Sequence, residues 1–261
     1  MSASQLFAGK VALVTGSTSG IGFASARKFA QGGARAVILN GRNPETGERK
    51  RAELAALAPD CDIRFIAADM NSPADIARLF SETRAQAGGL DIFVHSGYGG
   101  GAKPDLFANL SPDDTAQVIT AVFTSLVRCC HHAVPLLREA GGGAVIGVAS
   151  DAAKVPTPGE AVHGGALAAN VMFLRTLARE VGRDGIRCNA VTPSLVKDTL
   201  NYDKVMADGF SRKIFEKLER RAQLGLPGPD DLAELIAFLA SPLASKITGQ
   251  VVSCNGGVSG A

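Results

Sequence analysis

We expect the 261-residue chain to form one α/β domain, residues 1–261, built on a doubly wound sheet of seven parallel strands. Short β-branched apolar runs alternate with longer segments of helical periodicity along most of the chain. A glycine-rich turn joins the first apolar run to the first helical segment. Hydrophobic residues make up 46% of the chain, and a single core of this size can bury about three quarters of the unfolded surface.

The glycine-rich turn lies between the apolar run 11–14 and a second strand that begins at Ala36. Gly16 permits a sharp turn, Gly20 lets the backbone approach phosphate oxygens, and Gly22 lets the helix pack on the sheet. The helix start adds free N–H groups and the positive end of its dipole. We therefore predict a Rossmann-type dinucleotide site whose pyrophosphate contacts are Gly16, Ser17, Ser19, Gly20, Ile21 and Gly22.

The other elements follow the same alternation. A serine before a proline, typical of an N-cap and first helical residue, stands at Ser72 and at Ser111. Pro229, followed by two aspartates, marks another helix start. We expect strands at 10–15, 36–40, 63–67, 91–95, 144–149, 186–191 and 250–254.

The alternation is interrupted between Pro193 and Pro229, so we expect residues 194–228 to form an insertion within the domain. Its apolar content indicates a partly apolar ligand beneath it. A stripe at helical spacing, Phe210, Ile214 and Leu218, is equally consistent with packing on the core.

Charge and cysteine content exclude several classes of function. The 27 basic and 25 acidic residues are interspersed, which is not typical of a nucleic-acid or membrane-surface protein. We see no signal peptide and no run of about 18 apolar residues, so we expect a soluble, cytoplasmic protein. The five cysteines have no zinc spacing, and Cys129 and Cys130 are helix neighbours that cannot reach one ion. We expect no metal and interpret the cysteines as core residues, with Cys188 and Cys254 buried on strands.

The glycine pattern Thr15-Gly-x-x-x-Gly-x-Gly resembles that of the short-chain dehydrogenase/reductase family, and the resemblance extends over nearly the whole chain. The segment 91–97, which ends in His95, Ser96 and Gly97, stands where that family usually has Asn-Asn-Ala-Gly. The segments 189–193, 247–250 and 255–257 are similar to later signatures of the family. The resemblance implies a nicotinamide dinucleotide and a lid formed by 194–228. It also implies further cofactor contacts at Asp69, Met70, Ser96, Gly97, Pro193 and Val196.

The end of the second strand indicates which cofactor binds. A carboxylate there accepts hydrogen bonds from the adenine ribose of NAD and repels a 2′-phosphate. This chain has Asn40, Gly41 and Arg42 instead, and a guanidinium can pair with the phosphate and stack on adenine. We expect NADP(H), with NAD(H) as the alternative, since Arg42 can also be a solvated loop charge.

The family's catalytic set is altered in this chain. Members carry a Ser, a Tyr thirteen positions later and a Lys four further, whereas this chain has Ser150, His163 and Leu167. The family's Asn in the long central helix is replaced by Val122. A histidine titrates near neutral pH without a neighbouring lysine, so the joint loss of Tyr and Lys is chemically coherent. The lost Lys contact to the nicotinamide ribose is a charged hydrogen bond of roughly 1.5–3 kcal/mol.

Three functions fit these residues. The first is an oxidoreductase of a small, partly apolar carbonyl or alcohol, in which Ser150 polarises the substrate oxygen and His163 exchanges its proton. The second is a lyase, dehydratase or retro-aldol enzyme, with His163 as base and Ser150 stabilising an oxyanion. The third is a catalytically silent ligand-binding protein, in which His163 only fills the space of the Tyr. Other side chains that we expect on loops near the site are His95, Tyr98, Lys154 and Glu160.

The resemblance also implies a homodimer or homotetramer. The family usually pairs its fourth and fifth helices across an interface. We expect the apolar face formed by Leu167, Val171, Leu174 and Ala178 to supply that contact.

Overall fold

The computed structural model describes residues 5–98, 103–207, 212 and 216–260. Its seven strands form one parallel sheet in the order β3-β2-β1-β4-β5-β6-β7, which confirms the predicted fold class. Every predicted strand is present, with each end within one residue of its predicted place. The strands are β1 (Val11–Thr15), β2 (Ala36–Gly41), β3 (Asp62–Ala67), β4 (Ile92–His95), β5 (Gly143–Val148), β6 (Ile186–Thr192) and β7 (Val251–Ser253).

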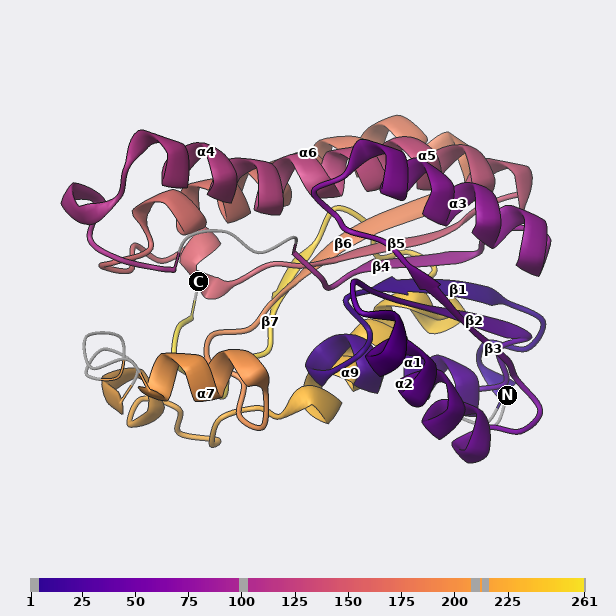
Figure 1. Cartoon of the computed structure of the whole chain (residues 1–261), viewed down its shortest axis with the longest axis horizontal. Coiled ribbons are helices and arrows are strands. Elements are labelled where there is room, and N and C mark those ends of the chain that lie inside the picture. Colours follow the sequence, from indigo (N-terminus) through magenta and orange to yellow (C-terminus); the bar gives the residue numbers. More distant parts are fainter. Residues whose placement is uncertain (1–4, 99–102, 208–211, 213–215, 261) are drawn as a thin grey trace.

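Helices cover both faces of the sheet (Figure 1). A separate apolar core lies between the sheet and each helical layer. One layer consists of α1 (Gly20–Gln31), α2 (Pro44–Leu57) and α9 (Pro229–Ala240), and the other of α3 (Pro73–Ala87), α4 (Pro112–Ile119), α5 (Ser125–Glu139) and α6 (Ala161–Val181). The shorter elements are α7 (Leu200–Ala207), η2 (Phe107–Asn109), η3 (Thr120–Thr124), η4 (Asp151–Ala153), η5 (Gly182–Asp184) and η6 (Pro242–Ala244).

The order of the strands fixes where a ligand can bind. β1 pairs with β2 on one side and with β4 on the other, so the direction in which the chain winds reverses between β1 and β4. In open parallel sheets the crevice for a ligand lies beyond the carboxyl ends of the strands at this reversal. Gly16 follows β1 directly and Ser96 follows β4 directly, so both turns border that crevice.

The predicted helix starts are present. The Ser72 side chain accepts from the Asp75 backbone N–H at 3.2 Å. Ser111 and Asp114 form a reciprocal capping box at the start of α4. These local contacts explain why the sequence alone located both helices.

The stretch from α4 to α5 is one continuous helix with a π-helical turn, η3, in its middle. Residues Pro112–Glu139 are long and apolar enough by composition to cross a membrane, and 44% of an apolar 18-residue stretch of this helix is buried inside the protein. Leu126, Cys129 and Leu137 of this helix are at most 1% exposed and pack in the core. The apolar face of this helix is therefore a core face of the α/β domain.

The expectation that Cys254 is buried on a strand is wrong. Cys254 lies after the end of β7 and is only partly buried, whereas Cys61, Cys129, Cys130 and Cys188 are buried.

The insertion 194–228 is buried in part. Leu195 and Val196 are buried and Leu200 is 64% exposed. The positions of Phe210 and Ile214 lie outside the described residues.

Candidate active site

The turn after β1 is packed too closely for any side chain at its first glycine. Gly16 has a φ of +63°, and a Cβ there would lie 2.4 Å from the Gly97 Cα atom in the turn after β4. A Cβ on Gly22 would lie 2.4 Å from the Gly16 carbonyl oxygen, so α1 also rests on this turn. The N-cap of α1, Ser19, makes no side-chain cap hydrogen bond. The first backbone N–H groups of α1 can therefore serve an anion.

Ser17 has a different part in this turn from the predicted one. Its hydroxyl donates to the Val14 carbonyl at 2.7 Å and its backbone N–H donates to the Asn40 carbonyl at 2.9 Å. The side chain is fully buried. Ser17 has no donor left for a phosphate and instead fixes the turn to β2.

Asn40 is equally structural. Its Nδ2 donates to the carbonyls of Ile66 and Ala68 at 3.1 and 3.2 Å, and its Oδ1 accepts from the Gly16 N–H at 3.4 Å. A carboxylate cannot donate these two bonds, so the fold itself disfavours an acid at this position. The lack of an acid at residue 40 therefore says little about which nicotinamide cofactor binds.

Arg42 lies just after β2 and is exposed. A Cβ on its neighbour Gly41 would lie 2.6 Å from the Thr18 Cγ2 atom, so the end of β2 touches the glycine turn. This contact brings Arg42 next to the predicted pyrophosphate site. It is the charged side chain among the predicted cofactor contacts that can attract a 2′-phosphate.

The remaining predicted cofactor contacts lie around the same edge of the sheet. Asp69 is partly buried and accepts from the Asn71 N–H at 2.9 Å. Met70 is 4% exposed and its sulfur is 3.8 Å from the Cys129 Sγ, which places the Met70 side chain in the core. Val196 is 7% exposed. Pro193 accepts from the Asp151 N–H at 2.8 Å and so joins the end of β6 to that of β5.

Ser150 and His163 lie on adjoining segments at the carboxyl end of the sheet. Ser150 caps η4, where its Oγ accepts from the Ala152 N–H at 3.2 Å. In the described part of the chain no hydrogen bond uses the Ser150 hydroxyl as donor, so its proton is available to a ligand. His163 is the third residue of α6. The next residue, Gly164, sits so close to η4 that a Cβ on it would lie 2.7 Å from the Ala152 carbonyl oxygen.

Two further positions that the sequence analysis singled out are apolar and buried. Leu167 follows His163 by one helical turn and is 6% exposed, and Val122 in the π-turn is 4% exposed. Asn170 continues the same stripe of α6, and its Nδ2 donates to the Val122 carbonyl at 3.2 Å. The buried environment beyond His163 thus contains the aliphatic side chains of Leu167 and Val122.

The predicted interface residues are not available to a partner. Leu167, Val171, Leu174 and Ala178 are at most 7% exposed because they form the core face of α6. The expectation that this face makes an interface is therefore wrong. The outward side of α6 instead carries Met172, which is 60% exposed.

Three of the four other candidate proton donors have structural partners. His95 is the last residue of β4, not a loop residue, and burial lowers its pKa to about 4. The Tyr98 hydroxyl donates to the Val148 carbonyl, and burial raises the pKa of this phenol. The Lys154 ammonium contacts the Ser253 hydroxyl at the end of β7. Glu160 precedes His163 by three residues, and burial raises the pKa of its carboxyl group.

Sequence reasoning missed Asp151, which follows Ser150 directly. Its carboxylate is 6% exposed and accepts from Asn255 Nδ2 at 2.5 Å and from Ser259 Oγ at 2.9 Å. These bonds, with that from the Asp151 N–H to Pro193, tie the C-terminal segment to the ends of β5 and β6. The signal in the sequence was an acid beside the candidate serine, and the side chains that donate hydrogen bonds to its carboxylate lie more than 100 residues away.

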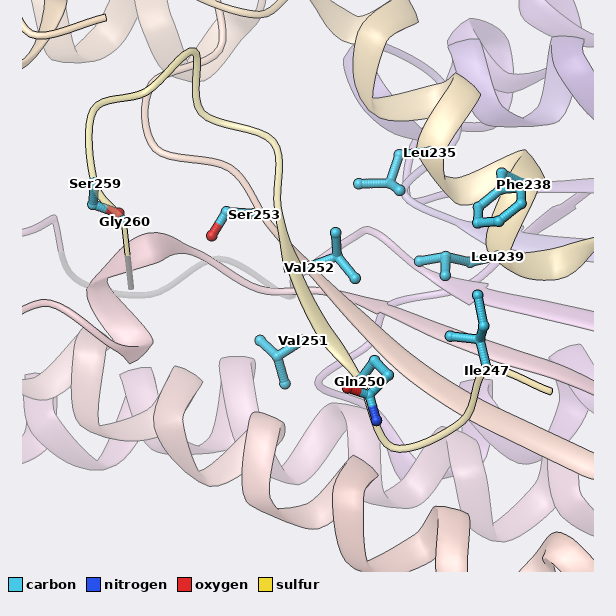
Figure 2. A pocket seen from close by; sticks show the side chains of 10 residues that line it. All are labelled: Leu235, Phe238, Leu239, Ile247, Gln250, Val251, Val252, Ser253, Ser259 and Gly260. Carbon is cyan, nitrogen blue, oxygen red and sulfur yellow. The ribbon is translucent and has the colours of Figure 1, made fainter.

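A cleft of about 600 Å³ runs along the edge strand β7 (Figure 2). Leu235, Phe238 and Leu239 of α9 face Val252 across it, while Val251 points to the other side of the strand. A second cleft, of about 630 Å³, lies at the amino ends of the strands. Neither cleft is lined by the glycine turn, Ser150 or His163.

Comparisons with known proteins extend over almost the whole chain. Residues 16–259 match a family model described as enoyl-(acyl carrier protein) reductase. A 3α-hydroxysteroid dehydrogenase of Mediterraneibacter gnavus is 31% identical over 248 residues, which are 95% of this chain and 96% of that protein.

Two solved structures have the same fold. A short-chain type dehydrogenase/reductase from Mycobacterium ulcerans superposes with a TM-score of 0.89 at 26% identity, over 97% of this chain and 90% of its own. L-sorbose reductase from Gluconobacter frateurii, solved with NADPH and L-sorbose, has a TM-score of 0.87 at 28% identity over 98% of each chain.

Proposed function

This chain belongs to the short-chain dehydrogenase/reductase family of oxidoreductases, and on that premise we propose an NADP(H)-dependent enzyme for a small, partly apolar carbonyl or alcohol. The observation that carries the proposal is the contact between the turns after β1 and β4. Gly16 and Gly97 meet there at a distance that excludes a Cβ, at the reversal of the sheet. Such a crevice, with a helix N-terminus beside it, suits a dinucleotide pyrophosphate.

The described residues fit a bound nicotinamide dinucleotide. The backbone N–H groups at Gly20–Gly22 would hold the pyrophosphate, and Arg42 would pair with a 2′-phosphate. The turns at Asp69 and at Ser96–Gly97 would flank the adenosine of the cofactor. The related L-sorbose reductase was solved with NADPH, which supports a preference for NADP(H) over NAD(H). When bound, this cofactor supplies or accepts the hydride.

Ser150 and His163 are the proposed catalytic residues. The Ser150 hydroxyl donates to the substrate oxygen, because its Oγ already accepts from Ala152 and its proton has no acceptor in the described structure. His163 gives a proton to that oxygen during reduction and removes one during oxidation. The buried aliphatic side chains of Leu167 and Val122 favour a ligand that is partly apolar on this side.

The same apolar surroundings favour a second candidate function. Leu167 cannot donate the charged hydrogen bond that a lysine would make to the nicotinamide ribose. Cofactor binding is therefore weaker by roughly 1.5–3 kcal/mol, which makes hydride transfer less favoured. A lyase, dehydratase or retro-aldol enzyme needs only the base His163 and the donor Ser150. A catalytically silent ligand-binding protein needs neither.

Cofactor titration separates these functions. Calorimetry with NADPH, NADP⁺, NADH and NAD⁺ tests binding, and a crystal with NADP⁺ shows whether the nicotinamide C4 faces the space between Ser150 and His163. We expect tight NADPH binding, that geometry, and reduction of apolar ketones or aldehydes. Gly16→Ala is the matched control, since its methyl group has no space beside Gly97 and should abolish binding. Failure of every nicotinamide nucleotide to bind the wild type would contradict the proposed oxidoreductase.

We extend the proposal to the setting of the enzyme. Residues 194–228, which contain α7, would act as the lid over the substrate. A homodimer or homotetramer would form through a surface other than the buried face of α6. The protein would act in the cytoplasm on a small molecule, without nucleic-acid or membrane partners.

A further inference from the structure

A buried chain of hydrogen bonds connects the glycine turn to the π-turn η3 through His95, and helix α6 donates a further hydrogen bond to the same π-turn. Thr15 Oγ1 lies 3.1 Å from His95 Nδ1, and His95 Nε2 lies 3.3 Å from Ser125 Oγ. Ser125 Oγ donates to the Ala121 carbonyl of the π-turn at 2.6 Å, and the next carbonyl of that turn, Val122, accepts from Asn170 Nδ2 at 3.2 Å. The four side chains that carry the chain are at most 2% exposed. They come from β1, β4, α5 and α6.

The direction of each bond can be derived from the donors available. The single O–H of Ser125 donates to the Ala121 carbonyl at 2.6 Å, its shortest contact, so its oxygen must accept from His95 Nε2–H. Burial lowers the pKa of His95 to about 4, so the ring is neutral near pH 7 and has one N–H. Nδ1 therefore carries a lone pair and accepts from the Thr15 hydroxyl.

This arrangement leaves the lone pairs of Thr15 for the turn after β4. Its oxygen accepts from the Ser96 N–H at 3.2 Å and from the Gly97 N–H at 3.4 Å. The same turn lies against Gly16, where there is no room for a Cβ. The protonation state of the ring therefore determines how Thr15 holds the two turns that border the cofactor crevice.

We propose that His95 is a positioning residue that, as the neutral Nε2–H tautomer, sets the shape of the cofactor crevice and couples it to the π-turn and α6. His95 is 1% exposed, so it would contact neither cofactor nor substrate. In its effect on ligand binding the proposal rests on the proposed function. It accounts for the fully buried imidazole and for the hydroxyl at Ser125, which the catalytic residues do not require.

The tautomer can be measured directly. Imidazole ¹⁵N chemical shifts near pH 7, assigned with His95→Asn, distinguish a protonated Nε2 from a protonated Nδ1. We expect Nε2–H in the wild type. In Ser125→Ala the Nε2–H loses its acceptor, so we expect a shift to Nδ1–H, which donates to Thr15. The control is Thr83→Val, since Thr83 is a buried helix hydroxyl that donates to the Leu79 carbonyl without an imidazole partner. A wild-type ring protonated on Nδ1, or on both nitrogens, would overturn the proposal.

The coupling is tested by NADPH binding. Loss of one neutral buried hydrogen bond corresponds to roughly a three- to tenfold change in an equilibrium constant. We expect Ser125→Ala to weaken NADPH by this factor and Thr83→Val to leave it unchanged. Addition of NADPH to the wild type should also shift the His95 ring signals, a measurement that needs no variant.

Two negative results have different meanings. If NADPH binds the wild type and leaves both the His95 signals and the Ser125→Ala affinity unaffected, the positioning role is wrong and the proposed function stands. If no nicotinamide nucleotide binds the wild type, the proposed function fails and the positioning role fails with it. The tautomer measurement would then report only on the fold.

Discussion

Protonation of His95 should make this fold sensitive to mild acid. The ring has a pKa of about 4 in the folded protein, against 6.5 for an unperturbed histidine, because burial disfavours its charged form. Between these values the unfolded chain binds more protons than the folded one. Stability is therefore complete above about pH 6.5 and is lost as the pH falls toward 4.

The magnitude follows from the two pKa values. Between pH 7 and pH 5 the free energy of unfolding should fall by about 2 kcal/mol on account of His95 alone. The full difference, reached near pH 4, is about 3 kcal/mol.

Urea denaturation at pH 7, 6 and 5, for the wild type and His95→Asn, measures this contribution. Carboxylates and the other histidines titrate in both proteins, so the difference between the two slopes isolates His95. We expect the variant to lose about 2 kcal/mol less than the wild type over this range. Equal slopes would refute the assignment of a neutral, buried imidazole.

Three further predictions concern the site. Arg42→Ala should weaken NADPH by roughly ten- to a hundredfold and leave NADH unchanged, as expected for loss of a charged pair with the 2′-phosphate; calorimetry with both nucleotides checks this, and unchanged NADPH affinity would remove Arg42 from the site. His163→Ala should lower the rate by roughly two orders of magnitude or more and abolish the acid limb of the pH–rate profile, whereas an unchanged profile would assign His163 to packing. His163→Tyr alone should reduce carbonyls poorly, because the phenol has no lysine beside it, and the double variant with Leu167→Lys should exceed it; a single variant that matches the double in the same assay would contradict this account.

Sequence patterns located the elements because those patterns are local. A buried parallel strand requires a continuous apolar run, and a helix start requires a cap within three residues, as at Ser111. The glycine turn could also be identified from the sequence, since Gly22 packs on Gly16 within one short βαβ unit, although the close contact of Gly16 itself is with the remote Gly97. These rules operate over a few residues, so the positions of strands and helices could be derived without a structure.

The use of each polar group depended on partners that are remote in sequence. Ser17 was a candidate phosphate contact, but its hydroxyl donates to the nearby Val14 carbonyl and its N–H to the carbonyl of Asn40, 23 residues away. His95 lies 80 residues from Thr15, and Asp151 lies 104 from Asn255. The sequence by itself determined the α/β fold and the glycine turn, and it supplied Ser150 and His163 as candidate residues. Only the tertiary structure decided which donors remain available, because hydrogen bonding and burial depend on which segments the fold brings together.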